Sequence, residues 1–200
     1  MIKTIDDLMM VYNNYADPLG KINREVKNKI LFPVVKGFYE TEINTPGLFL
    51  TSYIYGPSYV SFEYALYHHG LIPEKVTVFT NATFDKKRSK RYINLFGVFT
   101  YRDVPKSAYP FGIKVYTKNG YSYAIASPEK ALCDRLYIAK PQNSMKNIKL
   151  LIFESLRISE ESFLELNFNE LLFLCDKYQS TNIRLLKKII EKEEKKHDNS

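Results

Sequence analysis

The stretch GIKVYTKNGYSYAIASPEKALCDRLY, residues 112–137, joins a β-hairpin pattern to a helix start. The runs on either side of Asn119-Gly120 are rich in β-branched and aromatic residues, and this pair is favoured in a two-residue hairpin turn. Ser127 and Pro128 then provide an N-cap and a first helical residue. Strands that lead directly into a helix favour a fold of the α+β class.

Strand and helix patterns continue on both sides of this stretch. Upstream, GPSYVSFEYALYHHGLIPE at 56–74 predicts a helix that Ser58 or Ser61 caps and Gly70 ends. The runs VTVFT and FGVFTYRDV between this helix and the hairpin are typical of strands. Further helical patterns follow downstream, at 143–156, 159–165, 168–178 and 181–197. We therefore expect a mixed α/β domain with an antiparallel sheet and C-terminal helices.

The first forty residues predict two helices and a short hairpin. Thr4 is a suitable N-cap for the first helix, and the second spans 18–29 before the hairpin LFPVVKGFYE at 31–40. The second helix has an apolar stripe, formed by Leu19, Ile22, Val26 and Ile30. Its polar front carries Lys21, Arg24, Lys27 and Asn28.

This order of elements matches a short winged helix-turn-helix, which we assign to residues 1–45, with a second domain at 46–200. Arginine and asparagine on a helix can bind guanine and adenine edges, and lysine neutralises phosphates. Lys36 in the hairpin would contact the DNA backbone nearby. The same residues also fit a solvated helix face on a small lobe, because amphipathic helices with lysines are common.

Positive charge is concentrated in the middle of the chain. The whole sequence has a net charge of +7, but residues 75–150 hold fifteen basic and four acidic side chains, a net charge of +11. Residues 1–50 are neutral overall, and residues 151–200 have a net charge of −2. A basic centre permits a nucleic acid or an acidic protein as partner.

One run contributes much of this charge, at Lys86, Lys87, Arg88, Lys90 and Arg91. It lies between two strand patterns, so we expect a loop or hairpin tip. Five cations in six residues attract phosphates or an acidic protein surface. The alternative is a solvated loop without a partner.

Motifs of common enzymes are missing from the sequence. It contains no GxSxG elbow, P-loop, GxGxxG or HExxH pattern, so we expect no catalytic residue, no cofactor and no enzyme activity. His68 and His69 are adjacent and would point in different directions on a helix, which argues against a shared metal. Cys133 and Cys175 lie in apolar helical patterns and are expected to be buried free thiols, with no metal site.

The sequence also bears on the compartment. The N-terminal MIKTIDD is acidic and lacks the apolar segment of a secretion signal. No apolar run approaches the ~20 residues needed to span a bilayer. We expect a cytoplasmic protein with no membrane partner.

Three segments in order resemble the AbiEi family, the antitoxins of type IV toxin–antitoxin systems. They are GPSYVSFEYALYHHGLIPE, FGVFTYRDVP and SPEKALCDRLY, and the resemblance covers about residues 5–140. It implies an N-terminal winged helix-turn-helix that binds operator DNA and represses its own operon. It also implies a larger domain that counters a cognate nucleotidyltransferase-like toxin encoded nearby.

The family's DNA-binding role falls here on Lys21, Arg24, Lys27 and Asn28, in the helix before the KGFYE wing. The chain departs from a full winged helix because only two helices fit before that wing. SPEKALCDRLY has a structural role, as a cap, a helix start and a core face.

Three functional hypotheses follow. The first is a DNA-binding antitoxin that neutralises its toxin and represses its own operon. The second is an interaction protein that inhibits a toxin and binds no specific DNA. The third, and the weakest, is an enzyme that processes nucleic acid.

Overall fold

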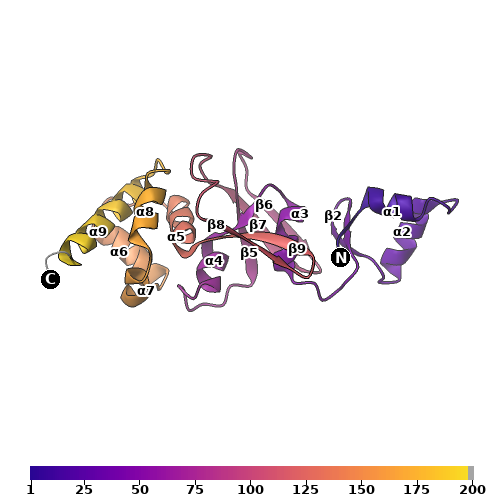
Figure 1. Ribbon diagram of the computed structural model, residues 1–200, viewed down its shortest axis with the longest axis horizontal. Helices are drawn as coiled ribbons and strands as arrows, with labels where there is room; N and C mark the ends of the chain where they lie inside the picture. Colours follow the sequence, from indigo (N-terminus) through magenta and orange to yellow (C-terminus); the bar gives the residue numbers. More distant parts are fainter. Residues whose placement is uncertain (198–200) are drawn as a thin grey trace.

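The fold is α+β, as the sequence predicts, and is extended along one axis (Figure 1). The computed structural model describes residues 1–197, and the side chains of residues 1–195. A small N-terminal lobe lies at one end, a six-stranded sheet occupies the middle, and the C-terminal helices form the other end (Figure 1). No helix within the described range combines the length and apolar character that crossing a bilayer requires.

The N-terminal lobe, residues 3–40, contains two helices and a three-stranded antiparallel sheet of order β1-β3-β2. Its elements are β1 (Lys3–Thr4), α1 (Ile5–Val11), α2 (Pro18–Lys27), β2 (Phe32–Val35) and β3 (Phe38–Glu40). Thr4 caps α1 in a reciprocal capping box with Asp7, and Asp17 caps α2 by accepting from the Gly20 N–H at 2.8 Å. Leu8, Ile22 and Leu31 form its small core.

The predicted apolar stripe of the second helix is only half correct. Ile22 is buried and Val26 is half-buried, but Leu19 and Ile30 are each 52% exposed. The helix ends at Lys27, two residues earlier than predicted, and Lys29 has a φ of 57°. The chain therefore changes direction before Ile30, so this residue does not lie in the apolar stripe.

The central sheet has the order β6-β7-β5-β4-β9-β8 and is mixed, so the prediction of an antiparallel sheet is wrong. Its strands are β4 (Tyr59–Val60), β5 (Val78–Thr83), β6 (Lys90–Asn94), β7 (Gly97–Asp103), β8 (Ile113–Lys118) and β9 (Tyr121–Ala126). β5 runs parallel to β7, and β4 runs parallel to β9. The reason is that β6 pairs with β7 on the side away from β5, so β7 returns in the direction of β5.

The Asn119-Gly120 turn is confirmed. β8 and β9 pair antiparallel from Ile113–Ala126 to Lys118–Tyr121, with two residues between the strands. Asn119 and Gly120 have φ values of 52° and 78°, as a type I′ turn requires at both central positions.

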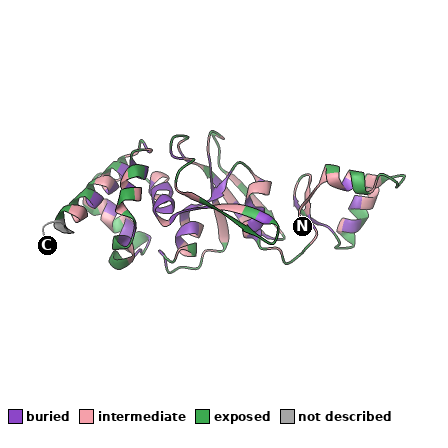
Figure 2. Cartoon of the chain, viewed as in Figure 1, coloured by how far each residue is buried: buried purple, intermediate pink, exposed green. Residues whose placement is uncertain are grey.

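Short helices cover the sheet. Between the N-terminal lobe and β4, the chain forms a 3₁₀ turn η1 (Gly47–Leu50) and α3 (Thr51–Ile54), whose apolar residues pack with Phe99 and Tyr101 of the sheet. α4 (Phe62–His68) and α5 (Pro128–Tyr137) belong to the larger core. Figure 2 shows α5 buried over almost its whole length. The helices predicted after Ser61 and Ser127 are therefore present.

The C-terminal helices complete this larger core, which runs from Tyr59 to Ile190. They are α6 (Met145–Lys149), a π-helical segment η2 (Leu150–Ser155), α7 (Glu160–Leu164), α8 (Phe168–Cys175) and α9 (Thr181–His197). The single helix predicted at 143–156 is thus divided between an α-helical and a π-helical part. The other three helices lie where they were predicted.

Gly112 precedes β8 at a position where a side chain would not fit. Its φ is 65°, and an added Cβ would lie 2.8 Å from the Cβ of Lys130. Gly70 has a similar φ of 75° but no atom within 4 Å of an added Cβ. We expect Gly112→Ala to lower the unfolding free energy by about 1–3 kcal/mol more than Gly70→Ala, because overpacking adds to the backbone strain. Urea unfolding of the two variants tests this, and equal losses would contradict the close approach.

Candidate functional site

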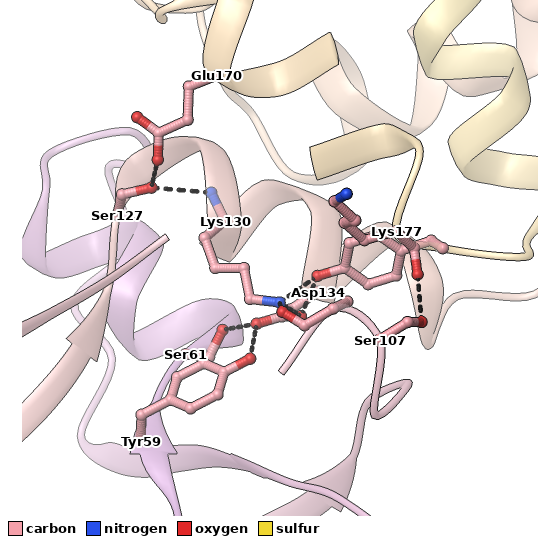
Figure 3. A network of polar contacts seen from close by, with 10 residues as sticks. Tyr59, Ser61, Ser107, Ser127, Lys130, Asp134, Glu170 and Lys177 are labelled. Carbon is pink, nitrogen blue, oxygen red and sulfur yellow. Dashed lines mark hydrogen bonds and ion pairs between the residues drawn. The ribbon is translucent and has the colours of Figure 1, made fainter. Parts of the chain in front are cut away.

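The most polar cluster of the interior lies between β4, α5 and the end of α8 (Figure 3). The ammonium of Lys130 donates to the Ala108 carbonyl at 2.8 Å and the Tyr178 hydroxyl at 2.6 Å, and lies 3.2 Å from the Asp134 carboxylate. Asp134 also accepts from Tyr59 at 2.8 Å and Ser61 at 2.7 Å. The hydroxyl of Ser61, a predicted helix cap, is therefore used for Asp134.

This cluster is closed to solvent. The side chains of Lys130 and Asp134 are both 0% exposed. Burial lowers the pKa of Lys130 although Asp134 opposes that shift, and burial beside Asp134 raises the pKa values of Tyr59 and Tyr178. Because every charged atom has partners and no substrate can reach them, we assign the cluster to the architecture of the core.

The exposed face of α2, together with its C-cap, carries three of the five residues predicted to bind DNA. Arg24, Lys27 and Asn28 are exposed on the surface of the N-terminal lobe. Arg24 and Lys27 take part in none of the ion pairs formed within the described part of the chain. Their charges are therefore available to an external anion.

Lys21 is placed differently. Its ammonium lies 3.0 Å from the carboxylate of Glu25 and 5.3 Å from the ring centre of Tyr15. Glu25 also accepts from the hydroxyl of Tyr12, and this hydrogen bond raises the pKa of Tyr12 to about 12. Lys21 thus belongs to the contact between α1 and α2, and its charge is neutralised within the lobe.

Lys36 is exposed in the β2–β3 turn and borders a groove of about 410 Å³. The groove is also lined by Asn23 of α2 and Ile93 of β6, so it lies where the lobe meets the central sheet. The side-chain amide of Asn94 donates to the Val34 carbonyl at 2.8 Å across this junction. α2, the turn and the β6 edge therefore border one groove. Asn23, which borders the groove, was not among the residues predicted to bind DNA.

The basic run is partly a loop and partly a strand. Lys87 and Arg88 are exposed in the loop, but Lys90 and Arg91 begin β6, so the prediction of a loop holds only for its first half. The backbone N–H groups of Lys86 and Lys87 both donate to the Asp103 carboxylate at 2.7 Å. The Lys86 ammonium donates to the Gly56 carbonyl at 3.1 Å, so Lys86 is held in place.

One face of β6 and β7, which we call the basic sheet face, is uncovered. Strand pairing places Arg91 beside Thr100 and Ile93 beside Val98, while Arg102 follows Thr100 on the same face. Arg91 and Arg102 are exposed, and Ile93 is 65% exposed. The sequence did not indicate that Arg102 lies near Arg91, because this proximity depends on the pairing register between β6 and β7.

The two cysteines, and the histidines His68 and His69, have partners within the chain. Cys133 and Cys175 are buried free thiols, as predicted, and the hydrogen bond with Cys175, together with burial, raises the pKa of Cys133 well above its usual range. His69 contacts the Ala126 carbonyl at 2.8 Å, and burial lowers the pKa of His68. Within residues 1–195, no three potential ligands lie together.

Glu40 connects the N-terminal lobe to the central sheet. Its carboxylate accepts from the Tyr121 hydroxyl at 2.6 Å, from the Thr41 N–H at 2.8 Å and from the Glu42 N–H at 3.1 Å, and it contacts the Met1 ammonium. Burial opposes ionisation, yet these donors together hold the pKa of Glu40 below its ordinary value of 4.5.

Because of the Glu40 carboxylate, we expect the stability of the fold to depend on pH in the acidic range. A group whose folded-state pKa is lowered stabilises the fold fully above its unfolded-state pKa, and the stabilisation is lost as pH falls through the folded-state value. We therefore expect the unfolding free energy to fall below pH 4.5, and to fall less steeply in Glu40→Gln. Urea unfolding between pH 6 and pH 3 measures both slopes. Parallel curves for the two proteins would show that Glu40 does not contribute.

Comparisons with known proteins do not extend this picture: no protein-family model and no curated protein matches the chain. The exposed basic residues and the resemblance of three sequence segments to the AbiEi family therefore remain the grounds for assigning a function.

Proposed function

We propose that this chain is a DNA-binding antitoxin of the AbiEi type, which represses its own operon and neutralises a nucleotidyltransferase-like toxin. The observation that carries the DNA-binding part is the exposed face of α2, where Arg24 and Lys27 have no internal counter-charge. Next to this face stands the β2–β3 turn with Lys36. In this proposal the lobe acts as a short winged helix-turn-helix, with α2 in the major groove and the turn as its wing.

The basic centre supports the same proposal. The basic sheet face and α2 border one groove, so a duplex lying on α2 can continue towards Arg91 and Arg102. Lys87 and Arg88 lie in the loop that leads into the same edge strand. The side chains of α2 would then contact both bases and phosphates, and the central sheet would contribute further phosphate contacts.

Binding of the purified chain to the DNA upstream of its own gene tests the repressor function. We expect that DNA to be bound at least tenfold more tightly than a shuffled duplex of equal composition, at equal salt. Equal affinities for both duplexes would contradict specific recognition. The antitoxin function has a separate test, which is growth rescue when the chain is co-expressed with the toxin encoded beside it.

A second candidate function is toxin inhibition without specific DNA binding. The observation in its favour is that several apolar side chains of the N-terminal lobe are exposed, among them Met10, Val11 and Leu19. Exposed apolar groups favour a protein partner over a phosphate backbone. Growth rescue without any preference for the upstream DNA would support this candidate.

A further inference from the structure

β8 is an open edge of the central sheet. Among the residues that the structure describes, it pairs with β9 alone. Its pairing has no register shift over six residues, and every residue from Lys114 to Lys118 is exposed (Figure 2). No proline interrupts the strand. A regular and exposed edge of this length is a template for an additional strand.

The direction of its backbone groups follows from the pairing. The Ser127 N–H donates to the Gly112 carbonyl at 2.7 Å, and the two-residue turn closes on Lys118 and Tyr121. Hydrogen-bonded pairs alternate along an antiparallel ladder, so residues 114 and 116 also direct their backbone groups to β9. Residues 113, 115 and 117 direct theirs away from the sheet.

The side chains of β8 indicate what could bind. Residues 104–128 contain Lys106, Lys114 and Lys118 but no Asp or Glu. Lys114, Tyr116 and Lys118 alternate along one face of the strand, where Tyr116 is 42% exposed and stacks on Tyr123. Val115 is 68% exposed on the other face. The edge thus offers two cations and two apolar groups beside its outward backbone groups.

We propose that β8 binds an extended, acidic segment of a partner protein, which adds to the sheet as a further strand. Backbone hydrogen bonds to residues 113, 115 and 117 would hold the segment. Its acidic side chains would pair with Lys114 and Lys118, while its apolar side chains would cover Val115. This site goes beyond the proposed DNA-binding function and does not use the residues of α2.

Charge distinguishes this occupant from the alternatives. If two copies of β8 paired antiparallel, Lys114 and Lys118 of each copy would lie within reach of the same residues of the other, which is unfavourable. A single-stranded nucleic acid would use Tyr116 and the lysines, but it would leave the backbone groups of residues 113, 115 and 117 unpaired. The acidic strand is the occupant that uses all the exposed groups.

The variant Val115→Pro changes the outward edge of β8 without changing the rest of the sheet. Proline removes the outward N–H of residue 115 and leaves every hydrogen bond between β8 and β9 in place, as tolerated at sheet edges. Val115→Thr keeps the N–H and the branched shape, and is the matched control. The double variant Lys114→Glu, Lys118→Glu reverses the charge without touching the backbone. It keeps the proposal testable if the proline variant does not fold.

The probe is a fluorescent peptide of alternating glutamate and valine. Its controls are a lysine–valine peptide and a peptide with the same glutamates and valines in two blocks. We expect the alternating acidic peptide to bind, and to slow the amide hydrogen exchange of Val115 and Thr117. Affinity should fall at least tenfold in Val115→Pro and in the charge-reversed variant, and much less in Val115→Thr, which weakens the apolar contact but keeps the outward N–H.

Other results would overturn the proposal. They are no binding at millimolar peptide, equal binding by wild type and Val115→Pro, or equal binding of the block peptide. Binding of a ten-residue oligo-dT at β8 without binding of the peptide would assign the edge to nucleic acid. A dimer of the free protein that Val115→Pro dissociates would assign it to a second copy. DNA binding through α2 is measured separately, so its failure is distinguishable from a failure here.

Discussion

Replacing Asp134 by Ala should lower the unfolding free energy by about 3–5 kcal/mol, which is a large part of the stability of an ordinary domain. The change leaves the fully buried ammonium of Lys130 without its counter-charge. It also removes the acceptor of the Tyr59 and Ser61 hydroxyls. Burial already lowers the pKa of Lys130, and loss of Asp134 would lower it further. Urea unfolding at pH 7 measures the loss.

The exposed ion pair between Lys187 and Asp176 provides the control. Its atoms lie 2.6 Å apart, but both side chains are solvent-accessible, so Asp176→Ala should have a much smaller effect than Asp134→Ala. The double variant Lys130→Met, Asp134→Leu removes both charges and should recover part of the loss. A loss below about 1 kcal/mol for Asp134→Ala would show that the cluster does not stabilise the core.

The double variant Arg24→Ala, Lys27→Ala should bind the upstream DNA on the order of a hundredfold more weakly, at about tenfold for each lost contact. Both side chains are exposed, and both lie on the polar face of α2. Truncating them leaves the buried Ile22 and the capping residue Asp17 in place, so the lobe should remain folded. Fluorescence anisotropy at a fixed salt concentration gives the affinities.

Lys21→Ala is the matched control, since it removes a cation from the same helix. Lys21 is paired with Glu25, so its loss should weaken the contact of α1 with α2 and change DNA affinity little. If Lys21→Ala weakened binding as much as the double variant, the assignment of the DNA-binding face would be wrong. Circular dichroism spectra separate loss of fold from loss of contact.

Local sequence signals were sufficient for much of the secondary structure. The Asn119-Gly120 turn and the Ser127-Pro128 helix start depend on residues adjacent in sequence, and both occur in the structure. The C-terminal end of α2 was predicted two residues too late, because the positive φ of Lys29 has no local signature comparable with glycine. The π-helical segment after Lys149 likewise carries the same apolar periodicity as an α-helix.

Pairing between distant strands could not be predicted in this way. Nothing in the run VTVFT indicates that β5 lies parallel to β7, because this pairing depends on β6 taking the outer side of β7. The position of Arg102 on the basic sheet face depends on this order. The ion pair of Lys21 is different, since Glu25 follows it by four residues on the same helix and the sequence spacing could have indicated the pair; only the contact of Glu25 with Tyr12 requires α1 to pack on α2.

The salt dependence of binding to the upstream DNA shows whether Arg24 and Lys27 contact its phosphates. Affinity of the wild-type chain and of Arg24→Ala, Lys27→Ala would be measured between 50 and 300 mM salt. We expect the slope of log affinity against log salt to be about 1.8 smaller in the double variant, at about 0.9 for each phosphate contact. Equal slopes would mean that Arg24 and Lys27 do not contact DNA, and that α2 is not the DNA-binding face.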